Sequence, residues 1–315
     1  MGVESIRELG IKIKNNIKKV IVGKDDVIDI VLVSLISSGH VLLEDVPGVG
    51  KTMLAKCLSK SIDCEFKRIQ FTPDLLPSDL SGINYYNQKE GEFVFREGPI
   101  FACILLADEI NRATPRTQSS LLECMEEQQV TIDGETKLLP EPFFVIATQN
   151  PVEIQGTFPL PEAQMDRFIV RIKMGYPSLE EGKLILDRYQ SGSPITQVDA
   201  VADANDIITA QKELLKVKIG SASKEYVLKI IERTRKHDNI ILGVSPRGSI
   251  ALMKASQAFA ALNGRAYVTP DDIKYLAPFV LSHRLLLKGH AVTSGTDAAE
   301  SLIHSILNEV KTPIE

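Results

Sequence analysis

The chain has no tryptophan and only four cysteines among its 315 residues. Cys57, Cys64, Cys103 and Cys124 include no Cys-x-x-Cys pair and have no histidine close to them in the sequence. A zinc site or a redox motif therefore has little support. We expect four buried free thiols, which behave as small apolar side chains.

Long apolar runs and strongly basic segments are also missing. The longest apolar run, residues 30–36, contains Ser34 and is far shorter than the roughly 20 residues that cross a bilayer. Residues 1–8 carry no apolar secretory core, so we expect a cytoplasmic protein. The 36 Lys and Arg against 41 Asp and Glu give a net charge of -5, and the basic residues occur at most in pairs. This charge balance argues against a surface that binds nucleic acid.

The chain is 44% hydrophobic, which provides enough apolar surface for a buried core. Its length suits about two domains of roughly 150 residues each. The first 24 residues differ from the rest, because six Lys or Arg there outnumber two Glu. Ile6, Leu9, Ile13 and Ile17 recur at helical spacing in this segment. A basic amphipathic helix can lie on a membrane, but none of its residues is an aromatic anchor. We expect its apolar stripe to dock on the neighbouring domain.

Buried strands and helices alternate through the first half of the chain. Uninterrupted apolar strands separated by helices predict a parallel sheet that is covered on both faces, the arrangement of an α/β fold. The expected strands are 40–44, 66–71, 103–108, 143–150 and 168–174, and the expected helices are 26–38, 51–61 and 115–127.

Two insertions interrupt this alternation, at about 81–97 and 130–139. The first has aromatic runs on either side of Lys89-Glu90-Gly91, and the second has Asp133-Gly134 between alternating residues. Both patterns predict β-hairpins. Insertions of this kind are where a scaffold carries functional loops.

The pattern changes to helices after Pro177. We predict a core domain over 1–177 and a smaller, all-helical domain over 178–315. Ser245 and Thr269 are expected helix caps, each followed by a proline suited to the first turn. The expected helices are 179–190, 203–216, 223–237, 245–263, 270–282 and 298–310.

The sharpest local motif lies between the first strand and the next helix. Gly48 and Gly50 bring successive backbone N–H groups close to a phosphate at the positive end of a helix. Lys51 would reach the β- and γ-phosphates, and the Thr52 hydroxyl would bind Mg²⁺. Asp45 stands where the general P-loop pattern has its first glycine, a departure that can change how the loop enters its turn.

Two further polar groups follow buried strands. Asp108 and Glu109 end the strand that we place beside the P-loop strand. Asp108 would hold Mg²⁺ through its water shell, and Glu109 would polarise water for attack on the γ-phosphate. Asn150 ends a third strand and could orient that water. Strand-terminal acids are also common as solvated side chains, and an Asn before proline is also an ordinary turn residue.

These motifs together resemble the MoxR family of AAA+ ATPases. The resemblance covers nearly the whole chain and implies an αβα core with a helical lid, ATP or ADP at their junction, Mg²⁺, and assembly into a ring, most often a hexamer. The Asp-Val-Pro-Gly-Val-Gly start of the loop is usual for this family. The segments that carry the resemblance are Phe-Thr-Pro-Asp-Leu-Leu-Pro-Ser-Asp-Leu at 71–80, Gly-Pro-Ile-Phe at 98–101, Ala-Asp-Glu-Ile-Asn-Arg-Ala at 107–113, Ala-Thr-Gln-Asn-Pro at 147–151 and Gly-Thr-Phe-Pro-Leu-Pro-Glu-Ala-Gln-Met-Asp-Arg-Phe at 156–168.

The resemblance also implies roles for single residues. Arg167 matches the arginine finger that enters a neighbouring subunit's site, although an Arg beside Asp166 also reads as a surface ion pair. Arg247 matches sensor 2, acting within its own subunit or across the interface. The roles of Arg112 and Arg116 stay open. The implied catalytic set is Glu109, Asn150, Arg167 and Arg247, the nucleotide-binding set is Val22, Gly23, Gly48, Val49, Gly50, Lys51, Thr52 and Met53, and the metal set is Thr52 and Asp108.

The expected function is therefore a Mg²⁺-dependent ATP hydrolase that remodels or matures a partner protein. MoxR relatives typically work with partners that carry von Willebrand factor A domains, and this chain contains none, so such a partner would bind in trans. The two hairpins would face the ring pore or that partner. A nucleic-acid-associated AAA+ motor and a non-catalytic nucleotide switch are the alternatives.

Overall fold

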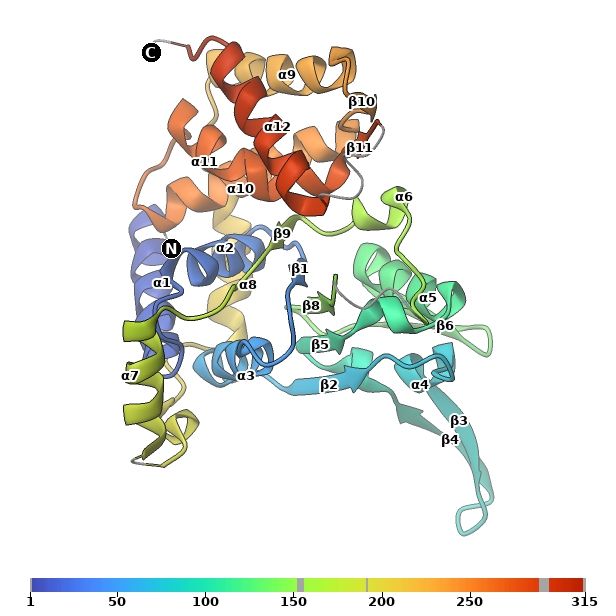
Figure 1. Cartoon of the computed structure of the whole chain (residues 1–315). Helices are drawn as coiled ribbons and strands as arrows, with labels where there is room; N and C mark the ends of the chain where they lie inside the picture. Colours follow the sequence, from blue (N-terminus) through green and yellow to red (C-terminus); the bar gives the residue numbers. More distant parts are fainter. Residues whose placement is uncertain (1, 152–155, 191, 289–294, 314–315) are drawn as a thin grey trace.

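The computed structural model describes residues 2–151, 156–190, 192–288 and 295–313 (Figure 1). Its centre is a five-stranded sheet in the order β2-β5-β8-β1-β9, in which all neighbouring strands are parallel. The strands are β1 (Val41–Glu44), β2 (Phe66–Gln70), β5 (Ile104–Asp108), β8 (Phe144–Gln149) and β9 (Val170–Ile172).

Alternate side chains of the central strands enter two different hydrophobic clusters. Leu43 and Ile146 join the larger cluster, whereas Leu42 and Val145 join the smaller one. The helices α2 (Asp25–Ile36) and α3 (Lys51–Ser61) contribute to the larger cluster, and α5 (Pro115–Glu127) contributes to the smaller one. The predicted parallel sheet with two covered faces is confirmed.

The order of the strands corrects one sequence-based expectation. We expected β5, which ends in the two acids, to pair with β1, but β8 lies between them and pairs with both. β5 and β8 are both buried apolar strands, so their hydrophobic patterns contain no information on which one is adjacent to β1. The acids therefore lie two strands away from the P-loop strand.

Both predicted hairpins are present. The first consists of β3 (Gly82–Asn87) and β4 (Glu92–Glu97), and the second of β6 (Gln129–Ile132) and β7 (Glu135–Leu138). Asp133 and Gly134 have φ values of 51° and 87°, the left-handed conformations that a two-residue hairpin turn requires. The β3–β4 ribbon extends away from the sheet (Figure 1), with Phe93 73% exposed.

The second half of the chain is helical, as expected, with one small addition. An antiparallel pair, β10 (Ile240–Leu242) and β11 (Leu286–Leu287), connects segments that the hydrophobic pattern did not mark as strands. Ser245 and Thr269 cap their helices by accepting hydrogen bonds from Gly248 N and Asp272 N. The helices are α7 (Leu179–Gln190), α8 (Ala204–Leu214), α9 (Ser221–Lys236), α10 (Pro246–Leu262), α11 (Pro270–Leu281) and α12 (Gly295–Glu309), and the short helices α4 (Pro77–Ser81) and α6 (Glu162–Met165) belong to the first half.

The N-terminal helix α1 (Val3–Lys18) docks on the rest of the protein. Its apolar stripe is buried against α2, α3, α8 and α10, which confirms the expected docking. Within the described residues, no helix combines the length and hydrophobicity needed to cross a membrane. The buried stripe consists of Ile6, Leu9, Ile13 and Ile17.

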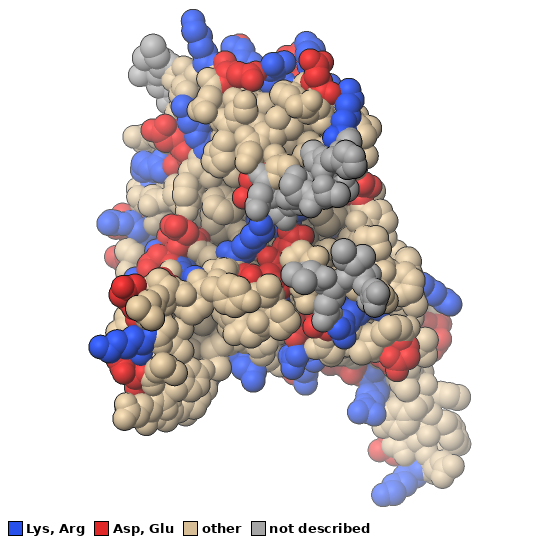
Figure 2. Space-filling view, in the orientation of Figure 1, with Lys and Arg blue, Asp and Glu red and all other residues tan. Residues whose placement is uncertain are grey.

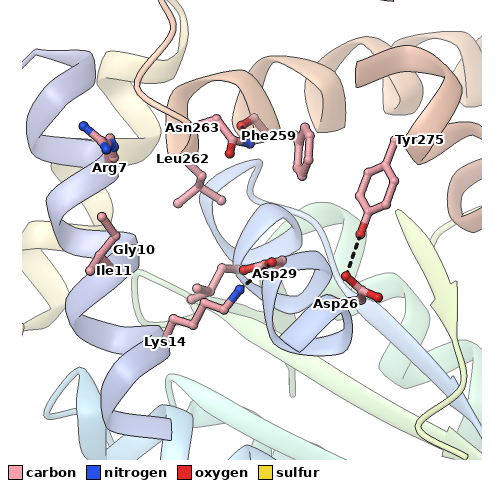
Figure 3. A pocket seen from close by; sticks show the side chains of 11 residues that line it. Arg7, Gly10, Ile11, Lys14, Asp26, Asp29, Phe259, Leu262, Asn263 and Tyr275 are labelled. Atoms are coloured by element: carbon pink, nitrogen blue, oxygen red, sulfur yellow. Dashed lines mark hydrogen bonds and ion pairs between the residues drawn. The ribbon is translucent and has the colours of Figure 1, made fainter. Parts of the chain in front are cut away.

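A cavity of about 560 Å³ lies where α1 and α2 meet α10 and α11 (Figure 3). Lys14 Nζ donates to Asp29 Oδ2 at 2.6 Å, and the Tyr275 hydroxyl donates to Asp26 Oδ1 at 3.4 Å. The Phe259 and Tyr275 rings stack with centroids 4.9 Å apart. The Tyr275–Asp26 hydrogen bond joins α2 to α11, and the other two contacts join α1 to α2 and α10 to α11.

Two histidines are fully enclosed by the fold. Val145 N donates to His40 Nδ1 at 3.1 Å, and His40 Nε2 lies 3.0 Å from Met125 O. Burial lowers the pKa of His40 to about 4, and burial together with the charge of Arg284 lowers the pKa of His283 well below 6.5. Both imidazoles are therefore neutral in the folded protein at neutral pH.

These histidines should make the protein acid-sensitive. Below the unfolded pKa near 6.5 the unfolded chain binds protons that folded His40 and His283 do not, so stability falls as pH decreases toward 4. From pH 7.5 to 5.5 we expect His40 to reduce the free energy of unfolding by about 1.4 kcal/mol, and His283 to add to this loss. Urea titration should show the loss, and His40→Gln should make it smaller by about 1.4 kcal/mol. An unchanged pH slope in His40→Gln would contradict the assignment.

Candidate functional site

The turn between β1 and α3 has the conformation of a phosphate-binding loop. Gly48 and Gly50 adopt φ values of 85° and 101°, in the left-handed region that favours glycine. Gly50 is the N-cap of α3, so the helix begins at Lys51 and directs its free N–H groups toward the turn. The turn therefore combines a helix dipole with exposed amides, which suits an anion.

Asp45, the residue that departs from the general P-loop pattern, fastens this turn to the sheet. Its Oδ2 accepts hydrogen bonds from Met174 N at 2.6 Å and Gly175 N at 2.7 Å, just after β9. Its Oδ1 accepts from Val46 N at 2.9 Å, and its carbonyl oxygen accepts from Lys51 Nζ at 2.9 Å. A glycine could not make these side-chain contacts, so the departure has a structural reason that the sequence motif did not reveal.

Lys51 lies within the electrostatic field of the strand-terminal acids. Partial burial of the ammonium lowers its pKa, while the charges of Asp108, Asp45 and Glu109 oppose that shift. The charges of Asp108 and Glu109 thus act on Lys51 through space. The two acids come from the end of β5, whereas Lys51 belongs to the loop that follows β1. Lys51 and these three carboxylates therefore lie near one another at the carboxyl edge of the sheet.

Thr148 connects the two acids to the intervening strand. Its hydroxyl donates to Asp108 Oδ1 at 2.5 Å and accepts from Glu109 N at 2.8 Å. Arg68 on β2 occupies the other Asp108 oxygen, with Nη2 at 2.7 Å and Nε at 3.1 Å from Oδ2. Sequence analysis assigned no role to Thr148 or Arg68. The available signal was a hydroxyl within the apolar strand β8, two residues before Asn150.

Glu109 adopts a left-handed conformation, with φ of 56°, directly after β5. Its Oε2 accepts from Gln70 Nε2 at 2.7 Å and lies 3.1 Å from Arg112 Nε. Gln70 ends β2 and was not identified from the sequence, whereas Arg112, whose role stayed open, contacts Glu109 of its own chain. Asn150 follows β8 at the same edge of the sheet and is 5% exposed.

A cavity of about 280 Å³ adjoins the P-loop glycines. Val22, Val49 and Met53, three of the expected nucleotide-binding residues, line it together with Ile185 and Tyr189 of α7. Neither α7 residue was identified from the sequence, because nothing in a helical pattern reveals which distant loop the helix will cover. The apolar walls and the adjoining anion-binding turn suit a flat base joined to phosphates.

Gly23 lies between Val22 and Lys24, which both line this cavity, and it adopts a left-handed conformation with φ of 68°. A Cβ atom at this position would lie 1.7 Å from Glu181 Oε1 at the start of α7. Lys24 also approaches Glu181, with Nζ 3.8 Å from Oε2. The absence of a side chain at residue 23 therefore allows α7 to approach the segment that leads into α2.

Arg167 and Arg247 converge on a different group, Glu126 near the end of α5. Arg167 Nε lies 3.1 Å from Glu126 Oε2, and Arg247 Nη2 donates to Glu126 Oε1. Asp166, the neighbour that we considered as the partner of Arg167, instead pairs with Arg284. The structure thus places the two expected arginines beside each other on one carboxylate.

The buried Arg284 connects the helical half to the segment around Arg167. Its Nε donates to Asp166 Oδ1 at 2.6 Å, and its Nη2 donates to Phe168 O at 2.7 Å. Ser245 Oγ, at the start of α10, donates to Asp166 Oδ2 at 2.9 Å. Rotation of the helical half would therefore shift residues 166–168 or break their hydrogen bonds to Arg284 and Ser245.

Comparisons with known proteins agree with this architecture. Residues 40–170 match the ATPase family associated with various cellular activities (AAA), and residues 232–304 match the AAA lid domain. The chain is 53% identical to the uncharacterized protein YeaC of Bacillus subtilis, covering 99% of this chain and 97% of that protein. It is 41% identical to the chaperone MoxR1 of Mycobacterium tuberculosis, covering 94% and 80% respectively. A crystal structure of a candidate ATPase from Cytophaga hutchinsonii matches with a TM-score of 0.92 at 39% identity, covering 99% of this chain and 97% of that one. The chain therefore belongs to the MoxR family of AAA+ ATPases.

Proposed function

We propose that this protein hydrolyses ATP to ADP and phosphate. The observation that carries the proposal is the convergence of three features: the amides of the turn at Gly48 and Gly50, the Lys51 ammonium, and the acids Asp108 and Glu109. A turn that only binds nucleotide has no need of a second carboxylate at the end of β5, two strands away. The base-sized cavity beside the turn supports a nucleotide as the ligand.

The residues divide the chemistry among themselves. The backbone amides of residues 48–53 hold the phosphates, and Lys51 neutralises charge on the β- and γ-oxygens. Glu109 accepts a proton from the attacking water, and Asn150 orients that water. Val22, Gly23, Val49 and Met53 enclose the base.

Magnesium fits this set of residues through Thr52 and Asp108. The described residues contain no group of three or more His, Cys, Asp or Glu side chains that could hold a metal ion on their own. That agrees with a Mg²⁺ that keeps water ligands and takes phosphate oxygens from the nucleotide. Bound there, Mg²⁺ would neutralise developing charge on the phosphates.

Assembly completes the proposed site. In a homo-oligomeric ring, most simply a hexamer, Arg167 would leave Glu126 and enter the nucleotide site of the next subunit, while Arg247 would couple phosphate to the lid. The relative named as the chaperone MoxR1 supports a partner or client protein, and one with a von Willebrand factor A domain is our specific proposal. The exposed hairpins β3–β4 and β6–β7 are the candidate contacts. We place the protein in the cytoplasm.

The face shown in Figure 2 gives no support to the alternative of a nucleic-acid motor. Lys and Arg side chains are mixed with Asp and Glu over the face shown in Figure 2, and the chain carries a net charge of -5. A phosphate backbone requires a field of one sign along its path. The relative named as the chaperone MoxR1 points instead to a protein client.

Lys51→Ala should weaken ATP binding by about 10- to 100-fold, because it removes a charge-assisted contact with the phosphates. Isothermal titration with ATP would measure this change. Lys56→Ala, on the exposed side of the same helix, is the matched control and should bind ATP normally. Equal affinities of the two variants would refute the phosphate role of Lys51.

Glu109→Gln should bind ATP with near-normal affinity but lower the turnover number by roughly 10² to 10⁴, the range for loss of a general base. Phosphate release at protein concentrations that support oligomers would measure turnover. Glu123→Gln, exposed on α5, serves as the control. Normal turnover in Glu109→Gln would assign water activation elsewhere. The variant loaded with ATP would also serve as a trap for client proteins.

Arg167→Ala should lower turnover by about 10³ to 10⁵ without loss of ATP binding, the range for removal of an arginine finger. Mixing it with Glu109→Gln should restore part of the activity, because mixed rings contain sites with an intact Glu109 and an intact neighbouring Arg167. Arg233→Ala, in the helical half, is the control. If the mixture stays as inactive as its components, Arg167 does not act between subunits.

A further inference from the structure

The four cysteines fall into two pairs with different environments. Cys57 and Cys124 are buried, as the sequence analysis expected for all four. Cys64 and Cys103 are only partly buried, which corrects that expectation for these two. They are far apart in the sequence and come together because β2 and β5 are neighbours in the sheet.

Cys64 and Cys103 flank the point where the two strands begin. Cys64 precedes β2 and Cys103 directly precedes β5. Between them, Ile104 N donates to Glu65 O at 3.0 Å. Both cysteine side chains pack against the same hydrophobic cluster, on the α3 side of the sheet. Extended by one residue, the strand register places Cys103 opposite Glu65, so Cys64 lies one residue along the diagonal. With strands about 4.8 Å apart and residues about 3.3 Å apart along a strand, this placement falls within the Cα separations that a disulfide accepts.

The two thiols also differ from the others in reactivity. A hydrogen bond from the Cys64 thiol lowers the pKa of Cys103 to about 7, and the same contact raises the pKa of Cys64. Burial raises the pKa values of Cys57 and Cys124 to about 12. At neutral pH, Cys103 is therefore the thiol with the largest thiolate fraction, and thiolate is the reactive form.

We propose that Cys64 and Cys103 form a redox-active dithiol, which small-molecule disulfides of the glutathione type oxidise to an intramolecular disulfide. The Cys103 thiolate attacks one sulfur of the small disulfide, whose S–S bond breaks and releases one thiolate. The Cys64 thiol then loses its proton to solvent and attacks the Cys103 sulfur, releasing the second small thiolate. The protein loses two electrons and two protons, and the small disulfide is reduced to two thiols.

The position of this pair connects it to the nucleotide site. Cys64 is fixed to the end of α3, since its N donates to Ser59 O at 3.1 Å and its carbonyl oxygen accepts from Ser59 Oγ at 3.0 Å. α3 begins at Lys51, and β5 ends at Asp108. A disulfide would therefore join the segment at the far end of the P-loop helix to the residue just before the strand that carries the acids.

The test uses the full-length reduced protein, incubated with oxidised glutathione at pH 7.5 and then analysed by intact mass and peptide mapping. We expect a mass decrease of about 2 Da, a Cys64–Cys103 cross-link, and recovery of the free thiols with dithiothreitol. Iodoacetamide should label Cys103 at least about 100-fold faster than Cys57 or Cys124, following their thiolate fractions.

Single variants separate the attacking role of Cys103 from the role of Cys64, which closes the disulfide. The Cys64→Ser variant should stop after the first step and retain one glutathione on Cys103. The Cys103→Ser variant should stay unmodified. Cys57→Ser and Cys124→Ser are matched controls and should form the disulfide as the parent does. Circular dichroism checks folding, and Cys64→Ala and Cys103→Ala replace any serine variant that fails to fold.

Three results would overturn the proposal. One is equal alkylation rates for all four cysteines. Another is a parent protein that accumulates glutathione adducts without forming the Cys64–Cys103 cross-link. The third is a Cys64→Ser variant that shows no more glutathione adduct than Cys103→Ser. None of these outcomes depends on ATP turnover, so the inference stands or falls separately from the proposed hydrolase.

Discussion

Burial of the central sheet on both faces is the constraint on which the site depends. Polar side chains within such strands lose their water, so charged groups collect where the strands end. All five strands are parallel, and their carboxyl ends meet at one edge. The P-loop, Asp108, Glu109 and Asn150 all lie there for this reason. Thr148 is buried inside β8, and its two hydrogen bonds to the acid segment compensate for the loss of water.

Motifs that lie within one continuous segment could be predicted from the sequence. The turn at Gly48 and Gly50, the acids after β5 and the hairpin turn at Asp133 each depend on local backbone geometry, which residue types encode. The position of β8 between β1 and β5 could not be predicted, because two equally apolar strands can exchange places without changing either pattern. Three other contacts could not be predicted for the same reason, because they join segments that are distant in sequence. They are the hydrogen bond of Gln70 to Glu109, the position of Tyr189 beside the P-loop, and the contact between Cys64 and Cys103.

Polar contacts at residues 166–168 also connect the two halves of the chain. Arg284 reaches Asp166 and the Phe168 carbonyl from the helical half, and Ser245 adds a second bond to the same carboxylate. Arg167 lies between these anchored residues, but its side chain and that of Arg247 share Glu126. A movement of the helical half would therefore change the contacts that surround Arg167.

The base-sized cavity is built from three separate parts of the chain: the segment around Val22, the P-loop helix at Met53, and α7 with Tyr189. A ligand that fills this cavity would contact all three parts and would therefore hold together elements that are distant in sequence. A ligand present at 100 times its dissociation constant would add about 2.7 kcal/mol to the stability of the folded chain. Because none of the α7 side chains is fully buried, a ligand in this cavity would add contacts where the helix has few of its own.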